Sequence, residues 1–552
     1  KDITYRDAYL EFYGIPIMYT PFLSHPDPTV DRRTGLLTPT YSSDSDLGTT
    51  VSLPYYIDIA PNMDATFTPL ITSLEDVVGS GEFRHRLRSS AYKLSGSLTQ
   101  GESPDVVGEE ELRGHIRGNL RHEFNPTWRG GADLHLATDD TYLRRYNFGS
   151  FDTLENRLFA EGFRGRTYAS ADAYYFQGQR ASDDSGDTPI VFPKLNLNFV
   201  SEPARFGGLW KLDADILSLS RTDGADTRRL SAKTKWELPY TSRLGEIYRV
   251  FASLQTDAYW VDELTERDAP ANTNSGLSGR IFPQAGMEWR LPFARKEERF
   301  TQIVEPIFSV VLAPNGQNRE QTPNEDSLSF EFDDTNLFSE NRFGGVDRVE
   351  GGSRVTYGLN SGVFGLNGGF SSFFIGQRYR LVDNDDFGEG TGLEDHFSDI
   401  VGRVEIAPTR YLKTLYRFRL DKDSFTPKRN ELESTLGVNA LKLHVNYLSL
   451  DQQNLSDILD PEDDFNDREE ITFGFTSQFT KRWHFGANTR RDLTSGGGPL
   501  RHSAYLNYGD DCFNIRVDYS RSFTRDRDIE PTDTIMFRIT FKTLGEVAGT
   551  SG

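Results

Sequence analysis

Apolar and polar residues alternate in many short stretches between about residues 36 and 542. In one of them Ile116, Leu120 and Phe124 share one side, while Arg117 and Arg121 lie on the other. Successive side chains of a β-strand point to opposite faces, so a period of two predicts a strand. No well-capped helix and no coiled-coil repeat is recognisable. We therefore expect an all-β protein.

Two all-β architectures fit this alternation. A soluble β-sandwich buries its apolar faces in a core, whereas a transmembrane β-barrel turns them towards lipid and lines a wet lumen with polar residues. Arginines on the polar faces, such as Arg417 and Arg419 between Tyr416, Phe418 and Leu420, favour the barrel. The stretches recur every 20 residues or so, which leaves roughly 20 to 26 membrane-spanning strands open.

The composition limits the class of protein further. Hydrophobic residues make up 36% of the chain, and the absence of any run of 18 apolar residues excludes a helical membrane protein. Aromatic residues reach 12%, too many for a disordered acidic chain. The formal net charge of −22 argues against a nucleic-acid partner. Acidic runs at residues 183–187, 383–396 and 460–470 are either solvated loops or, at a cell surface, ligands for divalent cations among lipid phosphates.

The sequence contains no catalytic motif that we recognise. It has nine histidines but no H-E-x-x-H, G-x-S-x-G or P-loop pattern. His502 and Ser503 are adjacent, and adjacent residues on a strand point to opposite faces, so they do not form a nucleophile and its base. We expect no enzyme, no cofactor and no metal site.

The stretch from Gly14 to Asp64 separates a short N-terminal part from the repetitive β region. Two of the earliest extended segments of the β region contain a proline, Pro39 in LLTPTY and Pro54 in SLPYYID. Proline has no backbone N–H, so each one removes a donor from the ladder of hydrogen bonds. We expect weak strand pairing in this part of the sheet.

Three segments resemble the LptD family of LPS-assembly outer-membrane proteins. They are GIPIMYTPFLSHPDP with RRTGLLTP and LPYYIDIAPNMDATFTP near the N-terminus, Ile303 to Leu359 in mid-chain, and DDCFNIRVDYSR at Asp510 to Arg521. The resemblance implies a barrel of 26 antiparallel strands at residues 34–552, in the outer membrane of a Gram-negative bacterium. Residues 1–33 would be the C-terminal end of a periplasmic β-jellyroll.

The resemblance also implies a function. Proteins of this family form a translocon that inserts lipopolysaccharide (LPS) into the outer leaflet through a lateral gate between the first and last barrel strands. Here these strands are expected at about residues 36–44 and 534–542. The implied partners are LPS as substrate, an LptA-type periplasmic jellyroll bridge, the lipoprotein LptE in the lumen, and outer-membrane lipid. The alternative from another class is a passive porin or an uptake channel for small solutes.

The residues that the resemblance places at the gate lie on the first, second and last strands. Matching prolines lie at the lateral gate of the family. Without the resemblance, both prolines could simply begin or bend edge-like segments. The predicted gate residues are Leu37, Pro39, Tyr41, Pro54, Ile535, Phe537 and Ile539.

A central segment dense in glycine and charge is the second candidate site. Two interpretations fit Arg342, Asp347, Arg348 and Arg354, which lie close to Glu350 in the sequence. They form an ion-pair network inside the barrel, or they contact a plug protein in the lumen. The resemblance supports a plug, because LptD barrels are filled by the lipoprotein LptE.

Cys512 is the single cysteine of the chain, so no disulfide closes within it. Members of the family carry two adjacent cysteines here, bridged to cysteines in or ahead of the jellyroll, whereas Asp511 occupies the first of these positions. The chain begins at Lys1 without a signal peptide, which suggests a processed or trimmed form. Cys512 is therefore either a partner for a cysteine further upstream or an unpaired thiol.

Overall fold

The computed structural model describes residues 2–12, 15–26, 32–104, 108–265, 273–319, 321–327, 331–366, 368–451, 467–511, 513–525 and 530–541. Almost all regular structure in these ranges is β, as predicted. The described residues contain one short helix, α1 (Tyr142–Arg145). None of the described helical structure is long and apolar enough to cross a membrane.

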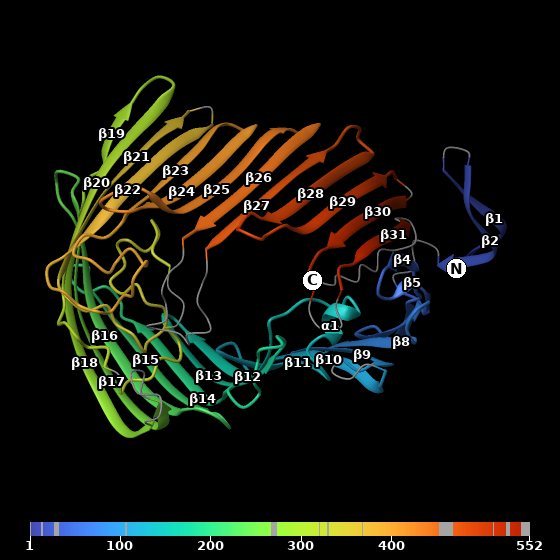
Figure 1. Ribbon diagram of the computed structural model, residues 1–552, viewed down its shortest axis with the longest axis horizontal. Helices are drawn as coiled ribbons and strands as arrows, with labels where there is room; N and C mark the ends of the chain where they lie inside the picture. Colours follow the sequence, from blue (N-terminus) through green and yellow to red (C-terminus); the bar gives the residue numbers. More distant parts are fainter. Residues whose placement is uncertain are drawn as a thin grey trace.

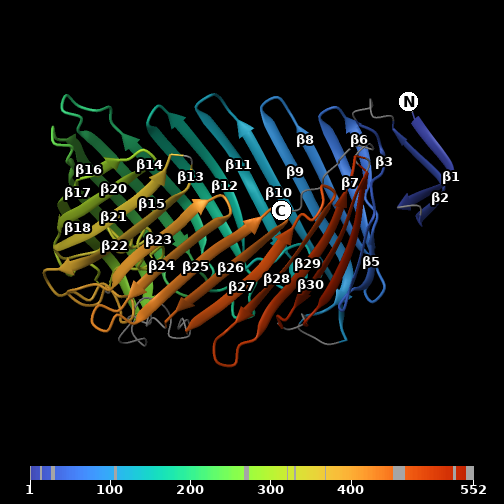
Figure 2. The same cartoon turned by 90° about the horizontal axis from the view of Figure 1, so that it is seen from above.

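One closed antiparallel barrel of 26 strands dominates the molecule (Figures 1 and 2), which confirms the predicted architecture. The first part of the wall consists of β3 (Gly35–Leu36), β4 (Thr40–Asp44), β5 (Gly48–Ser52), β6 (Tyr55–Ala60), β7 (Met63–Thr72), β8 (Val78–Arg86), β9 (Ser90–Glu102), β10 (Glu110–Glu123), β11 (Trp128–Ala137), β12 (Thr153–Arg164), β13 (Thr167–Gly178), β14 (Ile190–Val200), β15 (Leu209–Ser220), β16 (Asp226–Thr241), β17 (Ile247–Thr265) and β18 (Thr273–Arg290). The second part consists of β19 (Phe293–Lys296), β20 (Phe300–Leu312), β21 (Arg354–Gly365), β22 (Phe370–Arg380), β23 (Ile400–Thr409), β24 (Leu412–Leu420), β25 (Pro427–Val438), β26 (Leu441–Leu450), β27 (Arg468–Ser477), β28 (Trp483–Asp492), β29 (Pro499–Gly509), β30 (Phe513–Ser522) and β31 (Asp533–Phe541).

Three of the 26 strands are interrupted, and each interruption contains a proline. The first strand is β3 with β4, broken at residues 37–39; the second is β5 with β6, broken at 53–54; and the fourteenth is β18 with β19, broken at 291–292. Pro39, Pro54 and Pro292 each remove one ladder donor within these breaks. The first strand predicted at about residues 36–44 is present as β3 and β4 on either side of the break at Pro39, and the last strand, β31, begins one residue before the predicted start.

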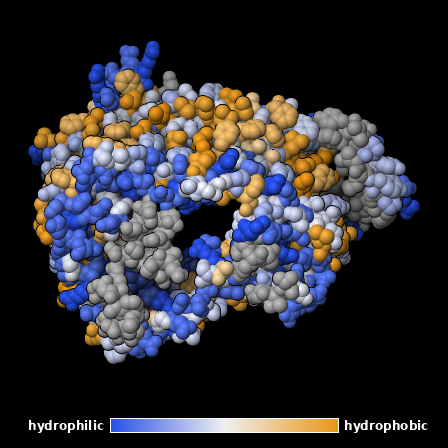
Figure 3. All heavy atoms as spheres, viewed as in Figure 1, coloured by the Kyte–Doolittle hydropathy of each residue, from blue (hydrophilic) through white to orange (hydrophobic). Residues whose placement is uncertain are grey.

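Alternation along each strand separates a lipid-facing side from a luminal side. On β16 and β18, Leu230 and Ile281 are 54% and 68% exposed, whereas the neighbouring Arg229 and Arg280 are buried. Figure 3 shows hydrophobic residues along the outer wall and hydrophilic residues around a central hollow. Arginines on the inside and aliphatic side chains on the outside are typical of a membrane-embedded barrel with a polar lumen.

The two rims of the barrel differ in their connections. Short turns such as 61–62, 87–89, 165–166 and 439–440 lie at the rim next to β1 and β2, which we call the N-terminal rim (Figure 2). The long connections lie at the far rim, and they include residues 138–152, 313–353 and 381–399. The acidic runs at 183–187 and 383–396 belong to connections at the far rim, and their position at the cell surface stays a prediction. Residues 460–466 lie outside the described residues.

The N-terminal part is a β-hairpin of β1 (Asp2–Phe12) and β2 (Ile15–Pro26). It forms a two-stranded sheet of its own beside the barrel (Figure 1). The Tyr9 and Tyr19 rings lie 4.9 Å apart on this hairpin. The barrel wall begins at Gly35, and the assignment of residues 1–33 to a jellyroll stays a prediction.

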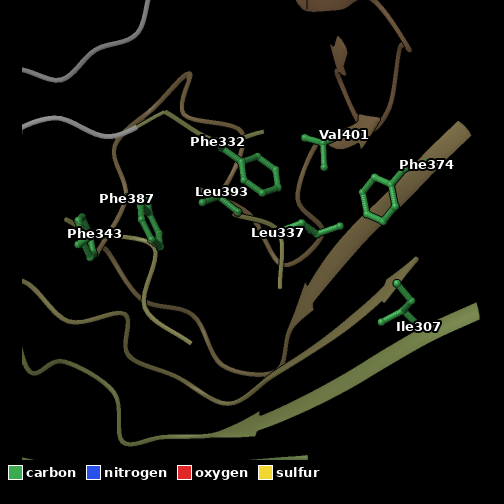
Figure 4. Packing of buried hydrophobic residues seen from close by; sticks show 8 residues of the cluster. All are labelled: Ile307, Phe332, Leu337, Phe343, Phe374, Phe387, Leu393 and Val401. Carbon is green, nitrogen blue, oxygen red and sulfur yellow. The ribbon is translucent and has the colours of Figure 1, made fainter. Parts of the chain in front are cut away.

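Residues 313–353, which we call the central loop, fold back into the lumen together with residues 381–399 (Figure 1). The two connections share an apolar cluster with the wall, in which the rings of Phe343 and Phe387 stack 4.7 Å apart. Figure 4 shows the cluster, which consists of Ile307, Phe332, Leu337, Phe343, Phe374, Phe387, Leu393 and Val401. One side of the lumen is thus filled by the chain itself.

Candidate functional site

The seam at which the barrel closes, between β4 and β31, is held by a short ladder. Its register runs from Ile535 opposite Ser43 to Arg538 opposite Thr40, which is four residue pairs. By contrast, β31 pairs with β30 along its whole length, from Asp533 to Phe541. The sheet is therefore weakly paired on one side of its last strand only.

Pro39 sets the point at which the seam ladder ends. Pro39 precedes Thr40 in the sequence and lies one residue closer to the N-terminal rim. Because proline has no backbone N–H, Pro39 cannot donate a hydrogen bond to β31. Ile539 lies directly after the last paired residue of β31, and it is buried although it has no ladder partner on the first strand. The part of the seam nearest the N-terminal rim is consequently unpaired.

The breaks in the first two strands lie side by side. Leu37 N donates a hydrogen bond to the carbonyl oxygen of Pro54 at 2.8 Å, and this bond joins the two interruptions. Leu53 N in turn donates to the carbonyl of Pro69 on β7 at 3.1 Å. Pro39 and Pro54, both predicted from the sequence, thus weaken adjacent strands at the same height of the wall.

The predicted gate side chains on the outer surface of the seam face lipid. Tyr41 is 45% exposed and Ile535 is 53% exposed, and Phe537 lies opposite Tyr41 in the register. On the luminal side the hydroxyl groups of Ser42 and Thr50 contact each other between β4 and β5. The seam is therefore apolar towards the membrane and polar towards the lumen.

At the far rim, two hydrogen bonds hold the end of the seam. Thr532 Oγ1 donates to Asp46 at 2.6 Å, and the backbone N–H of Asp533 donates to Ser45 Oγ at 3.3 Å. Leu47 of the same turn is buried in an apolar cluster with residues of α1. The seam is thus tied at the far rim and open at the N-terminal rim.

The central loop is fixed to the wall by buried ion pairs. Arg229 on β16 contacts Asp347 at 2.6 Å, Asp326 at 2.8 Å and Asp215 on β15 at 2.6 Å. Arg280 on β18 donates to the backbone carbonyl of Asp347 at 2.8 Å. Burial raises the pKa of Asp347 to about 6, although Arg229 opposes the shift. These contacts hold the loop against β15 to β18.

Glu350 forms the centre of a second network at the end of the central loop. It pairs with Arg342, with Arg354 at 3.3 Å and with Arg378 on β22 at 3.2 Å, and all four side chains are buried. Burial alone would raise the pKa of Glu350, but the three arginines lower it to about 2. Its ordinary value is 4.5, so the stabilisation is complete above that pH and is lost as the pH falls through 2.

Comparison with known proteins agrees with this architecture. The family model described as LPS transport system D matches residues 111–483. The chain belongs to this family, LptD. A second model, described as LptD protein, matches residues 3–158. A large β-barrel of this family indicates an outer-membrane protein of a Gram-negative bacterium.

Curated relatives carry the name LPS-assembly protein LptD. The protein from Nitrosomonas europaea is 26% identical over 440 residues, covering 76% of this chain and 59% of the relative. That from Alkalilimnicola ehrlichii is 26% identical and covers 99% of this chain and 71% of the relative. That from Thiobacillus denitrificans is 23% identical, with coverage of 99% and 72%. The chain thus spans 59% of the length of the Nitrosomonas europaea protein.

Solved structures overlay weakly. The ferric enterobactin receptor PfeA from Pseudomonas aeruginosa gives a TM-score of 0.33 at 11% identity, covering 93% of this chain and 81% of that chain. An overlay of this quality does not bear on the function.

The predicted plug contacts lie on the central loop of this chain and at the first residue of β21. Arg342, Asp347 and Arg354 are buried in the two networks of the central loop, as the ion-pair interpretation proposed. Arg348 is partly exposed on the same loop. Contact of these residues with a separate lipoprotein stays a prediction. Arg229, Arg280 and Arg378, on the wall, were not singled out in the sequence, because nothing in a strand pattern indicates which loop an arginine meets.

Two other expectations concern residues away from the seam. Cys512 lies outside the described residues, so its pairing stays open. His502 contacts Thr489 at 2.8 Å and Ser503 contacts Asn488 at 2.9 Å, so the two side chains have different partners. In the described part of the chain, no group of three or more His, Cys, Asp or Glu residues is arranged to hold a metal ion.

Proposed function

We propose that this LptD-family protein is a translocon that inserts LPS into the outer leaflet of the outer membrane through a lateral gate at the seam. The observation that carries the proposal is the four-pair ladder between β4 and β31. The N-terminal rim would face the periplasm, where an LptA-type jellyroll bridge delivers the lipid to the hairpin of β1 and β2. The protein would transport its substrate and perform no chemistry on it.

The energetics of the seam support a gate there. A closed barrel has no edges, so a lipid with a large polar head leaves its lumen only where a strand pair opens. Each ladder hydrogen bond contributes about 0.5–1.5 kcal/mol net. The pairing of β16 with β17 runs from Asp226 to Thr241 without a break, whereas the seam pairs only Thr40 to Ser43 with β31. Opening therefore costs least at the seam.

The direction of opening follows from the asymmetry of the seam. Pro39 leaves the part near the N-terminal rim unpaired, whereas Asp46 and Thr532 hold the far rim. Acyl chains would enter the membrane between the strands, while the sugar part passes through the polar lumen. The seam would thus open first from the periplasmic side.

Removing the two prolines is expected to slow LPS export. Pro39→Ala with Pro54→Ala restores two backbone donors, so the first two strands gain ladder hydrogen bonds of about 0.5–1.5 kcal/mol each. Surface LPS after a pulse of synthesis measures the rate. Pro239→Ala on β16, in an unbroken part of the wall, is the matched control and should leave the rate unchanged. An unchanged rate in the double variant would remove the prolines from the mechanism.

A lipoprotein partner of the LptE type is proposed to occupy the hollow that the central loop leaves open (Figure 3). Side chains do not fill a barrel of this width, and an open pore would admit large solutes. Affinity purification from outer membranes in mild detergent is expected to recover one lipoprotein in about equal amount. Recovery of the barrel alone from cells that export LPS normally would count against the partner.

The competing function is a passive porin or an uptake channel for small solutes. A porin or channel should show a steady conductance even when the barrel is recorded together with its copurified partners. Changes at the seam should then have no effect on the export of a lipid. Planar-bilayer recording of the copurified assembly separates the two functions, because a filled LPS translocon should conduct poorly.

A further inference from the structure

A basic pocket opens at the N-terminal rim, beside the second to sixth strands. Its volume is about 640 Å³, and it lies between the turns at 61–62 and 87–89. Asp64 is the single acidic residue among those that line it. The cationic lining residues are Arg32, Arg84, Arg86, Arg88, Lys93 and Arg121. Such a concentration of positive charge is unexpected in a chain with a net charge of −22.

Three of these cations serve the fold, and one of them, Lys93 on β9, pairs with Glu82 on β8 at 2.8 Å. Arg32 follows the N-terminal hairpin and donates to Asp64 at 2.7 Å and to the hydroxyl of Tyr56 at 2.8 Å, so it fixes the start of the barrel. Arg121 is paired with Asp133 on β11 at 2.7 Å. Their positive charges are largely compensated by these neighbours.

Three other cations have donors available for a ligand. Among the residues that the structure describes, the exposed side chains of Arg86 and Arg88 have neither an ion pair nor a hydrogen bond. Arg84 pairs with Asp64 at 2.7 Å and with Glu82 at 3.6 Å, both through Nε, which leaves its two terminal nitrogens for other acceptors. The described part of the pocket therefore has two guanidinium groups without an ion pair, Arg86 and Arg88, and a third, Arg84, whose terminal nitrogens are free to bind a ligand.

The chemistry of these groups selects the ligand. Guanidinium groups bind phosphate through two parallel hydrogen bonds, and several of them together favour a doubly charged phosphate monoester over a carboxylate. The same pocket is lined by Leu87, which is 46% exposed, and by Tyr92, whose ring lies against Phe83 on the outer face. Exposed apolar surface beside an anion site suits an amphiphile better than inorganic phosphate.

We propose that this pocket binds the phosphate groups on the headgroup of an anionic saccharolipid before the lipid reaches the seam. The choice of lipid rests on the proposed function, because the pocket is lined by residues of the turns at 61–62 and 87–89, at the rim where the N-terminal hairpin would deliver LPS. The pocket orients the phosphates towards the lumen, so the acyl chains are left on the side of the broken strands β3 to β6.

Binding by the purified full-length chain with its copurified partner, in phosphatidylcholine nanodiscs, tests the proposal. The probes are diphosphorylated lipid A, the same lipid without phosphates, and inorganic pyrophosphate. Arg86→Gln with Arg88→Gln should weaken binding of the diphosphorylated lipid about tenfold and leave the dephosphorylated lipid unaffected. Arg205→Gln with Arg243→Gln, in other turns of the same rim, removes the same charge and should change neither.

Several outcomes would overturn the proposal. Equal binding of the two lipids, or an equal loss in both pairs of variants, would mean that the pocket does not recognise phosphate. Saturable binding of pyrophosphate without any binding of lipid A would assign the pocket to a free anion. The experiment measures binding and not export. If the seam is not the gate, phosphate-dependent binding should still be observed. If the pocket does not bind phosphate, the gate is judged separately by the export experiments.

Discussion

A disulfide across the seam is expected to stop LPS from reaching the cell surface while the barrel stays folded. Tyr41 and Phe537 are directly opposite in the register of β4 and β31. Opposed residues of an antiparallel pair have Cβ atoms about 4.5–5.5 Å apart, close enough for a disulfide after a small adjustment. Tyr41→Cys with Phe537→Cys, in a Cys512→Ser background, therefore locks the weakest part of the wall. Surface LPS is measured with and without a reductant.

The matched control moves the same disulfide one strand along. Val517 on β30 is opposite Phe537 on the other side of β31, so Val517→Cys with Phe537→Cys locks a pair that the proposal leaves closed. This variant should export LPS normally. Heat-modified migration in gels checks that both cross-linked barrels are folded. Normal export by the seam variant in its oxidised form would place the exit elsewhere.

Glu350→Gln is expected to release the central loop from the wall. The substitution removes the one carboxylate that meets Arg342, Arg354 and Arg378, and it leaves three buried guanidinium groups without their anion. Breaking a buried ion pair by removing one partner costs about 3–5 kcal/mol. The ladders of the wall are untouched, so we expect a folded barrel with a loose loop, a higher single-channel conductance and protease cleavage within residues 313–353.

Glu298→Gln is the control for this experiment. Glu298 is exposed in the turn at 297–299, at the opposite rim from the central loop. Its substitution removes the same charge without touching a buried arginine, so conductance and cleavage should stay as in the unmodified protein. Unchanged conductance and cleavage in Glu350→Gln as well would mean that the Arg229 network and the apolar cluster hold the loop without Glu350.

The wall of this protein was largely predictable from its sequence. The period-two alternation of a strand is a property of residues close together in the sequence. The positions of Ile116 and Leu120 therefore predicted a strand without knowledge of its partner strands. Proline acts on its own backbone, so Pro39 and Pro54 indicated weak pairing before any partner strand was known. The strand number was narrowed to 26 by family resemblance and not by spacing.

The contents of the lumen were not predictable in the same way. Arg229 and Asp347 are 118 residues apart in the chain, and their contact depends on how the central loop folds back. The sequence offers many polar luminal residues as partners for each loop charge, and local pattern does not choose among them. The basic pocket was missed for the same reason, since Arg32 and Arg121 come together only when the wall has formed.

Photochemical capture of LPS in the seam during export tests the lateral gate most directly. A benzophenone amino acid is placed at Tyr41 or Ile535, which face outward at the seam, or at Leu230 on β16, which faces outward far from it. For a gate at the seam we predict cross-links to LPS at Tyr41 and Ile535 that disappear when LPS supply is stopped, and only a background level at Leu230. Equal capture at all three positions, or stronger capture at Leu230, would contradict it.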